Sequence, residues 1–454
     1  MAARSPRKGT DILRMPETKS LHAVARPIYN RRVVISGYGM ITPLGKNTEE
    51  TFRNASKGNS GIDYISAFDV NGLPCQIGGQ VKDAWVEDAG VLTNRRYDKF
   101  CSRGLKLMIV ATSEAVLQAK LDQVSNRERI GVSLGSFGSY PAIEDILSLH
   151  RFYDGNGNWD LESLVKEGVY DYLNFFRRRP DIASCALSIL FGCKGPNLSI
   201  TSACAAGAQA IGEAFKTIQE GRCDIMIAGG CDALAYISFI GFVSINALAE
   251  RYSAPQTASR PFDRKRNGFV LSEGAAAVIL EELEHAKRRD APIYGEALGY
   301  GSSADAYRIT DTDPEGEGAK LAIRGALADA SISPRDIEYI NAHGTSTVKN
   351  DLAETRAIKE VFGHGARELP ISSNKSMLGH AIAAAGPTEL ILTLVGMNRS
   401  IILPTINCEF PDPKCDLWYV PNETIEKSHK IALSNSFGFG GQNACLCIGK
   451  FPRK

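Results

Sequence analysis

Apolar runs of strand length alternate along this chain with segments in which apolar residues recur every three or four positions. The stretch "RRVVISGYGMITPLG" predicts a strand at Val33–Ser36. The next stretch, "NTEETFRNASKG", predicts a helix that is capped by Asn47 or Thr48 and ended at Gly58. Alternation of this kind over a whole chain is typical of an α/β fold.

A strand–helix–strand unit is the clearest pattern in the first half. The strand "NLSITSA" is followed by the helix "AAGAQAIGEAFKTIQEG", which ends at Gly221, and then by the strand "CDIMIAGG". Cys204 lies in the first turn of this unit. Four apolar side chains should form the buried face of its helix: Ala208, Ile211, Phe215 and Ile218.

The same order of strand, turn of small residues and helix returns after the basic segment "HAKRRDAP". Strands are predicted at "IYGEALGYG", "IEYINAHG", "IALSNSF" and "NACLCIG", with helices at "EGAKLAIRGALADA" and "DLAETRAIKEVFG". The sequence contains no literal repeat. We therefore expect two related halves, 31–287 and 288–454, with their boundary near residue 288.

Size and composition restrict the function classes. A chain of 454 residues should contain two domain-sized units, and its formal net charge of +1 argues against broad binding to nucleic acid or to a membrane surface. No apolar run reaches the ~18 residues of a membrane span. The eleven cysteines are scattered, which fits a reducing compartment, and Cys445 and Cys447 share one face of a strand, so a structural zinc is not expected.

The first thirty residues differ from the rest, because they are basic and poor in acids. This composition predicts an organelle presequence, and the small number of serines favours a mitochondrion over a plastid. A disordered basic tail on a cytosolic protein is the alternative. The charged residues are Arg4, Arg7, Lys8, Arg14, Lys19 and Arg26 against Asp11 and Glu17.

Cys204 is the candidate nucleophile. At the start of a helix, free N–H groups and the helix dipole stabilise an anion, so we expect the pKa of this thiol to be lowered. The same N–H groups can hold the oxyanion of a tetrahedral intermediate. The small residues at 203 and 205–207 either leave room for a substrate carbonyl or allow close backbone packing.

Two of the seven histidines lie at polar turns with small residues. His343 ends a strand and is followed by hydroxyl residues, and His380 lies five residues after Lys375, just before a helix. Two histidines and a thiol in such turns resemble an assembled site. Glu389 lies in an apolar helix, where an unpaired carboxylate is costly, so it should be exposed, or tied to a cation or to Lys375.

Two further segments have competing interpretations. The loop "NSFGFGGQNA" lacks GxGxxG and precedes a strand, so its glycines should let backbone N–H groups approach a reacting oxygen rather than bind a dinucleotide. The segment "TNRRYDKFCSRGLK" is either a solvated face or a docking site for an acidic partner. Its cations at near-helical spacing are Arg95, Arg96, Lys99 and Arg103.

Together these stretches resemble the type II β-ketoacyl-[acyl-carrier-protein] synthases, a class of condensing enzymes. The resemblance runs in family order from about residue 31 to the end of the chain. It is carried by "RRVVISGYGMITPLG", "KGPNLSITSACAAGAQAIG", "IMIAGGCDA", "ASRPFDRKRNGFVLSEGA", "INAHGTST", "SSNKSMLGHAIAAAG" and "NSFGFGGQNA".

The resemblance implies a thiolase-like fold of five layers, αβαβα, and usually a homodimer. It also implies decarboxylative condensation of an acyl-cysteine enzyme with malonyl-carrier protein in fatty acid elongation, without a redox cofactor. Cys204 would be the nucleophile, His343 and His380 would hold the malonyl thioester, and Lys375 would orient the site.

Further roles follow from the same resemblance. The N–H groups of Cys204 and Phe439 would form the oxyanion hole, Phe439 would gate the acyl pocket, and Thr345 and Thr347 would bind the pantetheine arm. The basic segment would dock acyl carrier protein. A structural monovalent cation would be held by Asn341, Glu389, Ser434 and Asn435.

Several stretches depart from the family pattern, including Val348 and Asn350 after the first histidine. The shortened "LGSFGSY", which contains Phe137, and the arginine-rich "NFFRRRPDIAS" leave the acyl chain length open. A polyketide-type ketosynthase fits less well, because "SACAAG" lacks the serines common there. A non-catalytic partner like a chain-length factor is disfavoured by the presence of Cys204, His343 and His380.

Overall fold

The strands of the two halves follow the same order. The computed structural model describes residues 31–88, 98–138, 143–168 and 172–452. The hydrogen-bonded order is β5-β4-β6-β7-β1 in the first half and β10-β9-β13-β14-β8 in the second. In both halves the first two pairings in this order are parallel and the last two antiparallel. The related halves expected from the sequence are therefore present.

Most of these strands overlap the predicted apolar runs, but β1 extends to Ile41 beyond the predicted end at Ser36, and β4 and β10 were not predicted. The first five are β1 Val33–Ile41, β4 Ile130–Gly135, β5 Asn197–Ile200, β6 Ile225–Asp232 and β7 Gly274–Glu282. The second five are β8 Gly295–Ala304, β9 Tyr339–Asn341, β10 Ile371–Ser372, β13 Ile431–Phe437 and β14 Gln442–Gly449. The predicted boundary near residue 288 falls at the end of α11, Leu283–Arg288. Because residues 31–454 form one compact unit, that boundary stays a prediction.

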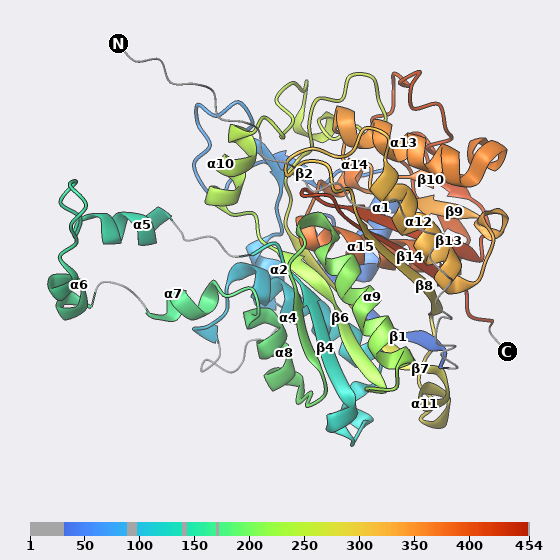
Figure 1. The fold of residues 1–454 in the computed structure, drawn as a ribbon, viewed down its shortest axis with the longest axis horizontal. Coiled ribbons are helices and arrows are strands. Elements are labelled where there is room, and N and C mark those ends of the chain that lie inside the picture. The colour runs from blue at the N-terminus through green and yellow to red at the C-terminus, as the bar shows by residue number, and fades with distance from the viewer. Residues whose placement is uncertain (1–30, 89–97, 139–142, 169–171, 453–454) are drawn as a thin grey trace, which may run out of the picture. The chain divides into compact units, whose positions relative to one another are not determined.

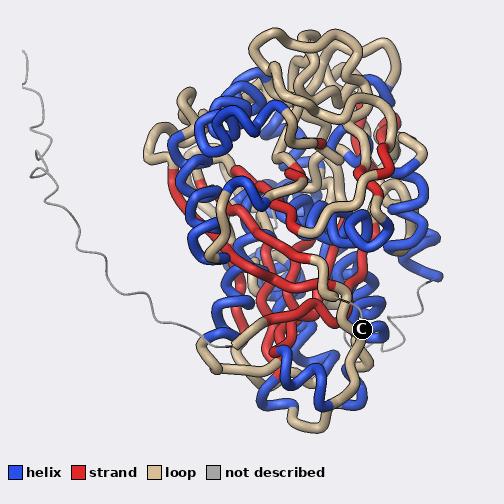
Figure 2. Tube along the Cα trace, turned by 90° about the vertical axis from the view of Figure 1, so that its right-hand side faces the viewer, coloured by secondary structure: helices blue, strands red, loops and turns tan. Residues whose placement is uncertain are grey.

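Helices cover both sheets and also separate them (Figure 1). The central pair is α9 Ala206–Gln219, which contacts β4, β6, β8 and β14, and α15 Ala385–Arg399, which contacts β7 and β13. The outer helices are α4 Arg103–Gln118 and α8 Ile182–Phe191 on the first half, and α12 Glu317–Ala330 and α13 Val348–Phe362 on the second. The strands run between these helical layers (Figure 2), and β1 pairs with β8 where the sheets join. This is the thiolase-like αβαβα arrangement.

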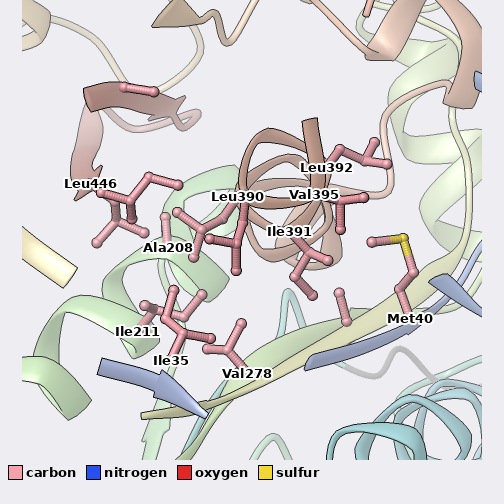
Figure 3. Packing of buried hydrophobic residues seen from close by; sticks show 14 of the residues in the cluster. Ile35, Met40, Ala208, Ile211, Val278, Leu390, Ile391, Leu392, Val395 and Leu446 are labelled. Carbon is pink, nitrogen blue, oxygen red and sulfur yellow. The ribbon is translucent and has the colours of Figure 1, made fainter. Parts of the chain in front are cut away.

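Strand β7 shows how one sheet serves two cores. Its side chains alternate, so Ala276, Val278 and Leu280 join the central core while the residues between them face the outer core under α4. The central core packs α9 and α15 against both sheets (Figure 3). The predicted buried face of α9 lies wholly in it.

Local details agree with the sequence. Helix α1, Thr48–Ser56, is capped by Asn47, whose Oδ1 accepts the N–H of Glu50 at 2.9 Å. Cys445 and Cys447 face the core outside the second sheet, and all eleven cysteines are free. In the described part of the chain, no helix has the length and apolar character that crossing a membrane requires.

Two similar turns precede the central helices. The turn before α9 is a 3₁₀ segment, Ala203–Ala205, and the turn before α15 is another, Ile382–Ala384. Each begins with a left-handed residue, Ala203 at φ 48° and Ile382 at φ 47°. The two turns contact each other, so the start of α9 and the start of α15 meet at one place.

The other elements connect this framework. The helices are α2 Asp83–Asp88, α5 Ile143–His150, α6 Leu161–Glu167, α7 Tyr172–Arg177, α10 Tyr236–Ser244 and α14 Lys375–Leu378. Two small sheets pair β2 Ile62–Tyr64 with β3 Ile77–Gly79, and β11 Ile401–Ile402 with β12 Ile425–Glu426.

Candidate active site

The structure brings Cys204, His343 and His380 together. Cys204 lies in the turn before α9, His343 follows β9, and His380 follows α14. The Cys204 Sγ and a ligand nitrogen from each histidine lie within 4.8 Å of one another, and the imidazole ring centroids are 5.3 Å apart. All three side chains line one cavity of about 400 Å³. The three groups therefore share one reaction space.

The small residues around Cys204 serve both purposes considered from the sequence. A Cβ atom on Gly207 would lie 2.1 Å from the carbonyl oxygen of Ala383, and one on Gly230 would lie 2.4 Å from it. Close backbone packing thus requires glycine on the far side of the turn. On the near side, the cavity reaches the sulfur.

The expected lowering of the Cys204 pKa is wrong. Burial raises the pKa of this thiol to about 12, although the N–H of Phe439 donates to the sulfur and the charge of Lys375 opposes the rise. The cost of placing a thiolate in a protein interior exceeds these gains. The side chain is therefore a thiol in the free protein and must lose its proton as a substrate arrives.

Both imidazoles are neutral at physiological pH. Burial and the nearby charge of Lys375 hold the pKa of His343 and of His380 well below 6.5. The N–H of Ile382 donates to His380 Nδ1 at 3.2 Å, so the ring hydrogen of His380 is on Nε2. Within the described residues, His380 Nε2 and His343 Nδ1 are buried without a hydrogen-bond partner. The site thus offers a neutral donor to a bound carbonyl.

Glu354 fixes the loop that carries His343, a role the sequence reasoning missed. Its carboxylate accepts the N–H groups of His343 and Gly344, both at 2.8 Å, and also the Nδ2 of Asn435 at 3.0 Å. Burial raises the pKa of Glu354, while these donors oppose the rise. The sequence did contain a signal for this role, because Glu354 lies four residues before Ile358 and therefore on the apolar face of α13.

Glu389 is tied to Lys375, one of the three alternatives. The Lys375 Nζ lies 2.6 Å from Glu389 Oε1, and each side chain is only 2% exposed. Burial raises the pKa of Glu389 to about 7 against the effect of Lys375. The pair places a positive charge beside both histidines.

Four residues were expected to hold a monovalent cation. Asn341 Oδ1, Glu389 Oε2 and Asn435 Oδ1 are buried oxygens without a partner among the described residues, and Ser434 pairs with Asn341 across β13 and β9. Oxygen donors of this kind suit a hard cation. The residues therefore fit the group.

The predicted pantetheine and gate residues line the same cavity. Thr345 and Thr347 share a hydrogen bond of 2.9 Å between their Oγ1 atoms. Phe439 contacts Phe242, with ring centroids 6.1 Å apart. A second cavity of about 340 Å³ is lined by Phe242, Phe137 and Ile382 among other residues.

The candidate docking residues are only partly described. Arg95 and Arg96 lie outside the described residues, and Lys99 is exposed beside the Phe100 ring. Arg103 donates from Nε and Nη2 to the buried Glu273, each at 2.7 Å, and from Nη1 to Asp83. Because Arg103 binds the buried carboxylate of Glu273, we do not include it in the proposed docking surface for a partner protein.

Family models match most of the chain. Residues 30–286 match the N-terminal domain of β-ketoacyl synthases, and residues 294–409 match the C-terminal domain. The 3-oxoacyl-[acyl-carrier-protein] synthase 2 of Staphylococcus aureus (strain COL) is 42% identical over 427 residues, which cover 93% of this chain and 99% of the relative. The protein of the same name from Coxiella burnetii is 41% identical over 427 residues, 92% of this chain and 99% of the relative.

Solved structures give the same result. A β-ketoacyl synthase from Burkholderia phymatum has a TM-score of 0.82 at 30% identity, covering 93% of this chain and 100% of that one. A ketosynthase in complex with a type II polyketide acyl-carrier protein has a TM-score of 0.80 at 34% identity, with the same coverage. The chain, with a thiol and two neutral imidazoles in one cavity, belongs to the β-ketoacyl synthase family.

Proposed function

We propose that this chain is a 3-oxoacyl-[acyl-carrier-protein] synthase that elongates fatty acids by decarboxylative condensation. The observation that carries the proposal is the meeting of Cys204, His343 and His380 within 4.8 Å in one cavity. The proposed steps use side chains, backbone N–H groups and substrate groups alone.

The first step is acyl transfer. The Cys204 sulfur attacks the thioester carbonyl of an acyl-carrier protein, and its proton passes to a neutral imidazole. The N–H groups of Cys204 and Phe439 hold the developing oxyanion. The C–S bond to the carrier then breaks, and the imidazole passes the proton it received to the carrier thiolate. The acyl chain remains on Cys204 and extends into the second cavity.

The second step makes the carbon–carbon bond. The malonyl-carrier arm lies along Thr345 and Thr347, with its thioester oxygen beside the two imidazoles. Carbon dioxide leaves, and donation from His380 Nε2 and from His343 stabilises the enolate. The enolate carbon attacks the acyl-Cys204 carbonyl, the C–S bond to Cys204 breaks, and the 3-oxoacyl product stays on the carrier. The released Cys204 thiolate takes a proton from water, so the cycle closes with the uptake of one proton.

Fatty acid elongation is favoured over the two alternatives. Relatives 41–42% identical over most of the chain carry the name 3-oxoacyl-[acyl-carrier-protein] synthase 2, whereas the polyketide ketosynthase is 34% identical. A non-catalytic chain-length partner would not need a nucleophile and two imidazoles in one cavity.

Mass spectrometry of the intact protein tests the proposal. After incubation with acyl-carrier proteins of several chain lengths, the protein should gain one acyl group, which peptide mapping should place on Cys204. Turnover with malonyl-carrier protein should then release 3-oxoacyl-carrier protein. Absence of the acyl adduct with every chain length would contradict the proposed function.

We further propose that Arg95, Arg96 and Lys99 dock the acidic carrier protein. Charge reversal of these three residues to Glu should raise KM for acyl-carrier protein, because it replaces attraction by repulsion. Acyl-CoA analogues reach Cys204 without this surface, so their KM should change little. An equal rise for both substrates would remove the docking proposal.

A structural monovalent cation is proposed at Asn341, Glu389, Ser434 and Asn435. When bound, it would supply positive charge to the buried oxygens that lack a protein partner. Exchange of K⁺ or Na⁺ for the bulky tetramethylammonium ion should then lower the thermal unfolding temperature. An unchanged unfolding temperature would argue against the site.

A homodimer is proposed on the basis of strand β5. This strand is an edge of the large sheet, and its residues alternate between exposed and partly buried. Exposed edges invite pairing with another chain. Light scattering at micromolar concentration should give twice the chain mass of 49.1 kDa, and a monomer mass would contradict the proposal.

A mitochondrial address is proposed for residues 1–30, which lie outside the described residues. It rests on their basic, acid-poor composition. A fluorescent protein fused behind these residues should accumulate in mitochondria, whereas a variant with the six basic residues replaced by Gln should stay cytosolic. Cytosolic fluorescence from the unaltered fusion would defeat the address.

A further inference from the structure

Asp232, at the end of β6, ties together two loops that reach the site from different halves. Its Oδ1 accepts the N–H of Phe137 at 3.2 Å, and its Oδ2 accepts the N–H of Ala383 at 2.8 Å. Phe137 follows β4 in the first half, and Ala383 lies in the turn before α15 in the second. Asp232 also lines the second cavity.

The contact with Ala383 reaches His380. The preceding residue, Ile382, is β-branched and adopts φ 47°, a conformation that needs support from its surroundings. Its N–H donates to His380 Nδ1 and so keeps the ring hydrogen on Nε2. The peptide groups of Ala383 are held on both sides, because Asp232 accepts the N–H while Gly207 and Gly230 enclose the carbonyl oxygen.

The contact with Phe137 reaches the acyl side of the site. The Phe137 ring stacks on Phe242 with centroids 5.8 Å apart, and Phe242 in turn contacts Phe439. The N–H of Phe439 donates to the Cys204 sulfur. Asp232 thus supports a loop that lines the second cavity and contacts the gate.

We infer that Asp232 is a positioning residue that holds the His380 turn and the Phe137 loop in register around Cys204. The inference rests on the proposed function and extends it. Asp232 does not touch the reacting atoms. It fixes the tautomer of His380 through Ala383 and Ile382, and it fixes the wall of the acyl cavity through Phe137.

Asp232→Asn is the variant that tests the inference. Asparagine has the same shape but a single acceptor oxygen, so only one of the two N–H groups keeps its partner. Burial raises the pKa of Asp232 to about 8, so the effect is that of a buried N–H left without its acceptor, which corresponds to a fall in rate of about tenfold. We expect kcat for malonyl-thioester decarboxylation or for acyl transfer to fall by this factor, with KM for malonyl-carrier protein unchanged, because Thr345 and Thr347 are untouched.

Glu281→Gln is the matched control. Glu281 is a buried carboxylate on β7 that accepts from His285 and Arg289 and lines neither cavity. This variant should unfold at a lower temperature and keep the wild-type kcat per folded molecule. If Asp232→Asn behaves in the same way, Asp232 is a structural acid and the inference is overturned.

A second readout does not depend on turnover. In protein labelled with ¹⁵N-histidine, the wild-type His380 should show one tautomer with hydrogen on Nε2, identified by its loss in His380→Gln. Asp232→Asn should shift or broaden this signal, and Glu281→Gln should leave it unchanged. Wild-type rates with an unaltered signal in Asp232→Asn would overturn the inference. An inactive wild-type protein would instead contradict the proposed function.

Discussion

Replacement of Cys204 by alanine should abolish condensation, with a fall in rate of at least about a thousandfold. The variant lacks the sulfur that receives the acyl group, and among the described residues that line the cavity Cys204 is the only cysteine. Cys204→Gln should still decarboxylate malonyl-carrier protein, because His343 and His380 remain. Release of ¹⁴CO₂ and formation of 3-oxoacyl product measure the two steps separately.

Cys445→Ala provides the control for this experiment. Cys445 is a fully buried cysteine on β14 that faces the core outside the second sheet, and it does not line either cavity. Its removal should cost some stability and leave both steps unchanged. Condensation by Cys204→Ala at the wild-type rate would show that the nucleophile has been assigned wrongly.

The second large effect is expected on stability. Lys375→Met leaves Glu389 as a buried carboxylate without its lysine partner, and removal of one partner of a buried pair typically costs about 3–5 kcal/mol. The pKa of Glu389 is already raised from 4.5 to about 7, and loss of Lys375 should raise it further. A carboxyl group whose pKa is higher in the folded than in the unfolded protein stabilises the fold at pH values below its unfolded-state pKa. That stabilisation is lost as the pH rises through its folded-state pKa.

The loss should therefore depend on pH in a defined direction. Urea unfolding of Lys375→Met should show the full loss at about pH 8.5 and a smaller one at about pH 5, where Glu389 is protonated. Lys320→Met is the control, since Glu317 and Glu360, its partners, are 61% and 52% exposed and the loss should be about 1 kcal/mol or less. Equal losses in both variants, or a loss independent of pH, would contradict the account of the buried pair.

The periodicity of the chain was sufficient to predict most of the framework. Helix α9 and strand β6 were predicted nearly to the residue, because small residues begin the helix, Gly221 follows its end, and the apolar runs are long. The short strand β10 was not predicted, because two residues are too few to show an alternation of apolar and polar positions. Pairing between β1 and β8 is set by the packing of the two halves, which no local pattern contains.

The site was predicted in its parts but not in its electrostatics. Motifs identified Cys204 and both histidines, yet the rise in the Cys204 pKa depends on burial, which a helix-start argument does not include. Arg103 looked like one of a row of surface cations, although its partner Glu273 lies 170 positions later. Asp232 was missed for the same reason, because its partners are backbone groups 95 and 151 positions away. Glu354 was missed although its backbone partners lie only ten and eleven positions before it.

The two 3₁₀ turns before the central helices, each of which begins with a left-handed residue, have different roles in the two related halves. The second residue of the first turn is Cys204, and the second residue of its counterpart is Ala383. The first turn carries the reactive thiol, while the second turn contributes only backbone groups, such as the N–H of Ala383 that donates to Asp232. The two related halves therefore build one reaction centre between them, in which the second half supplies a supporting turn and no second nucleophile.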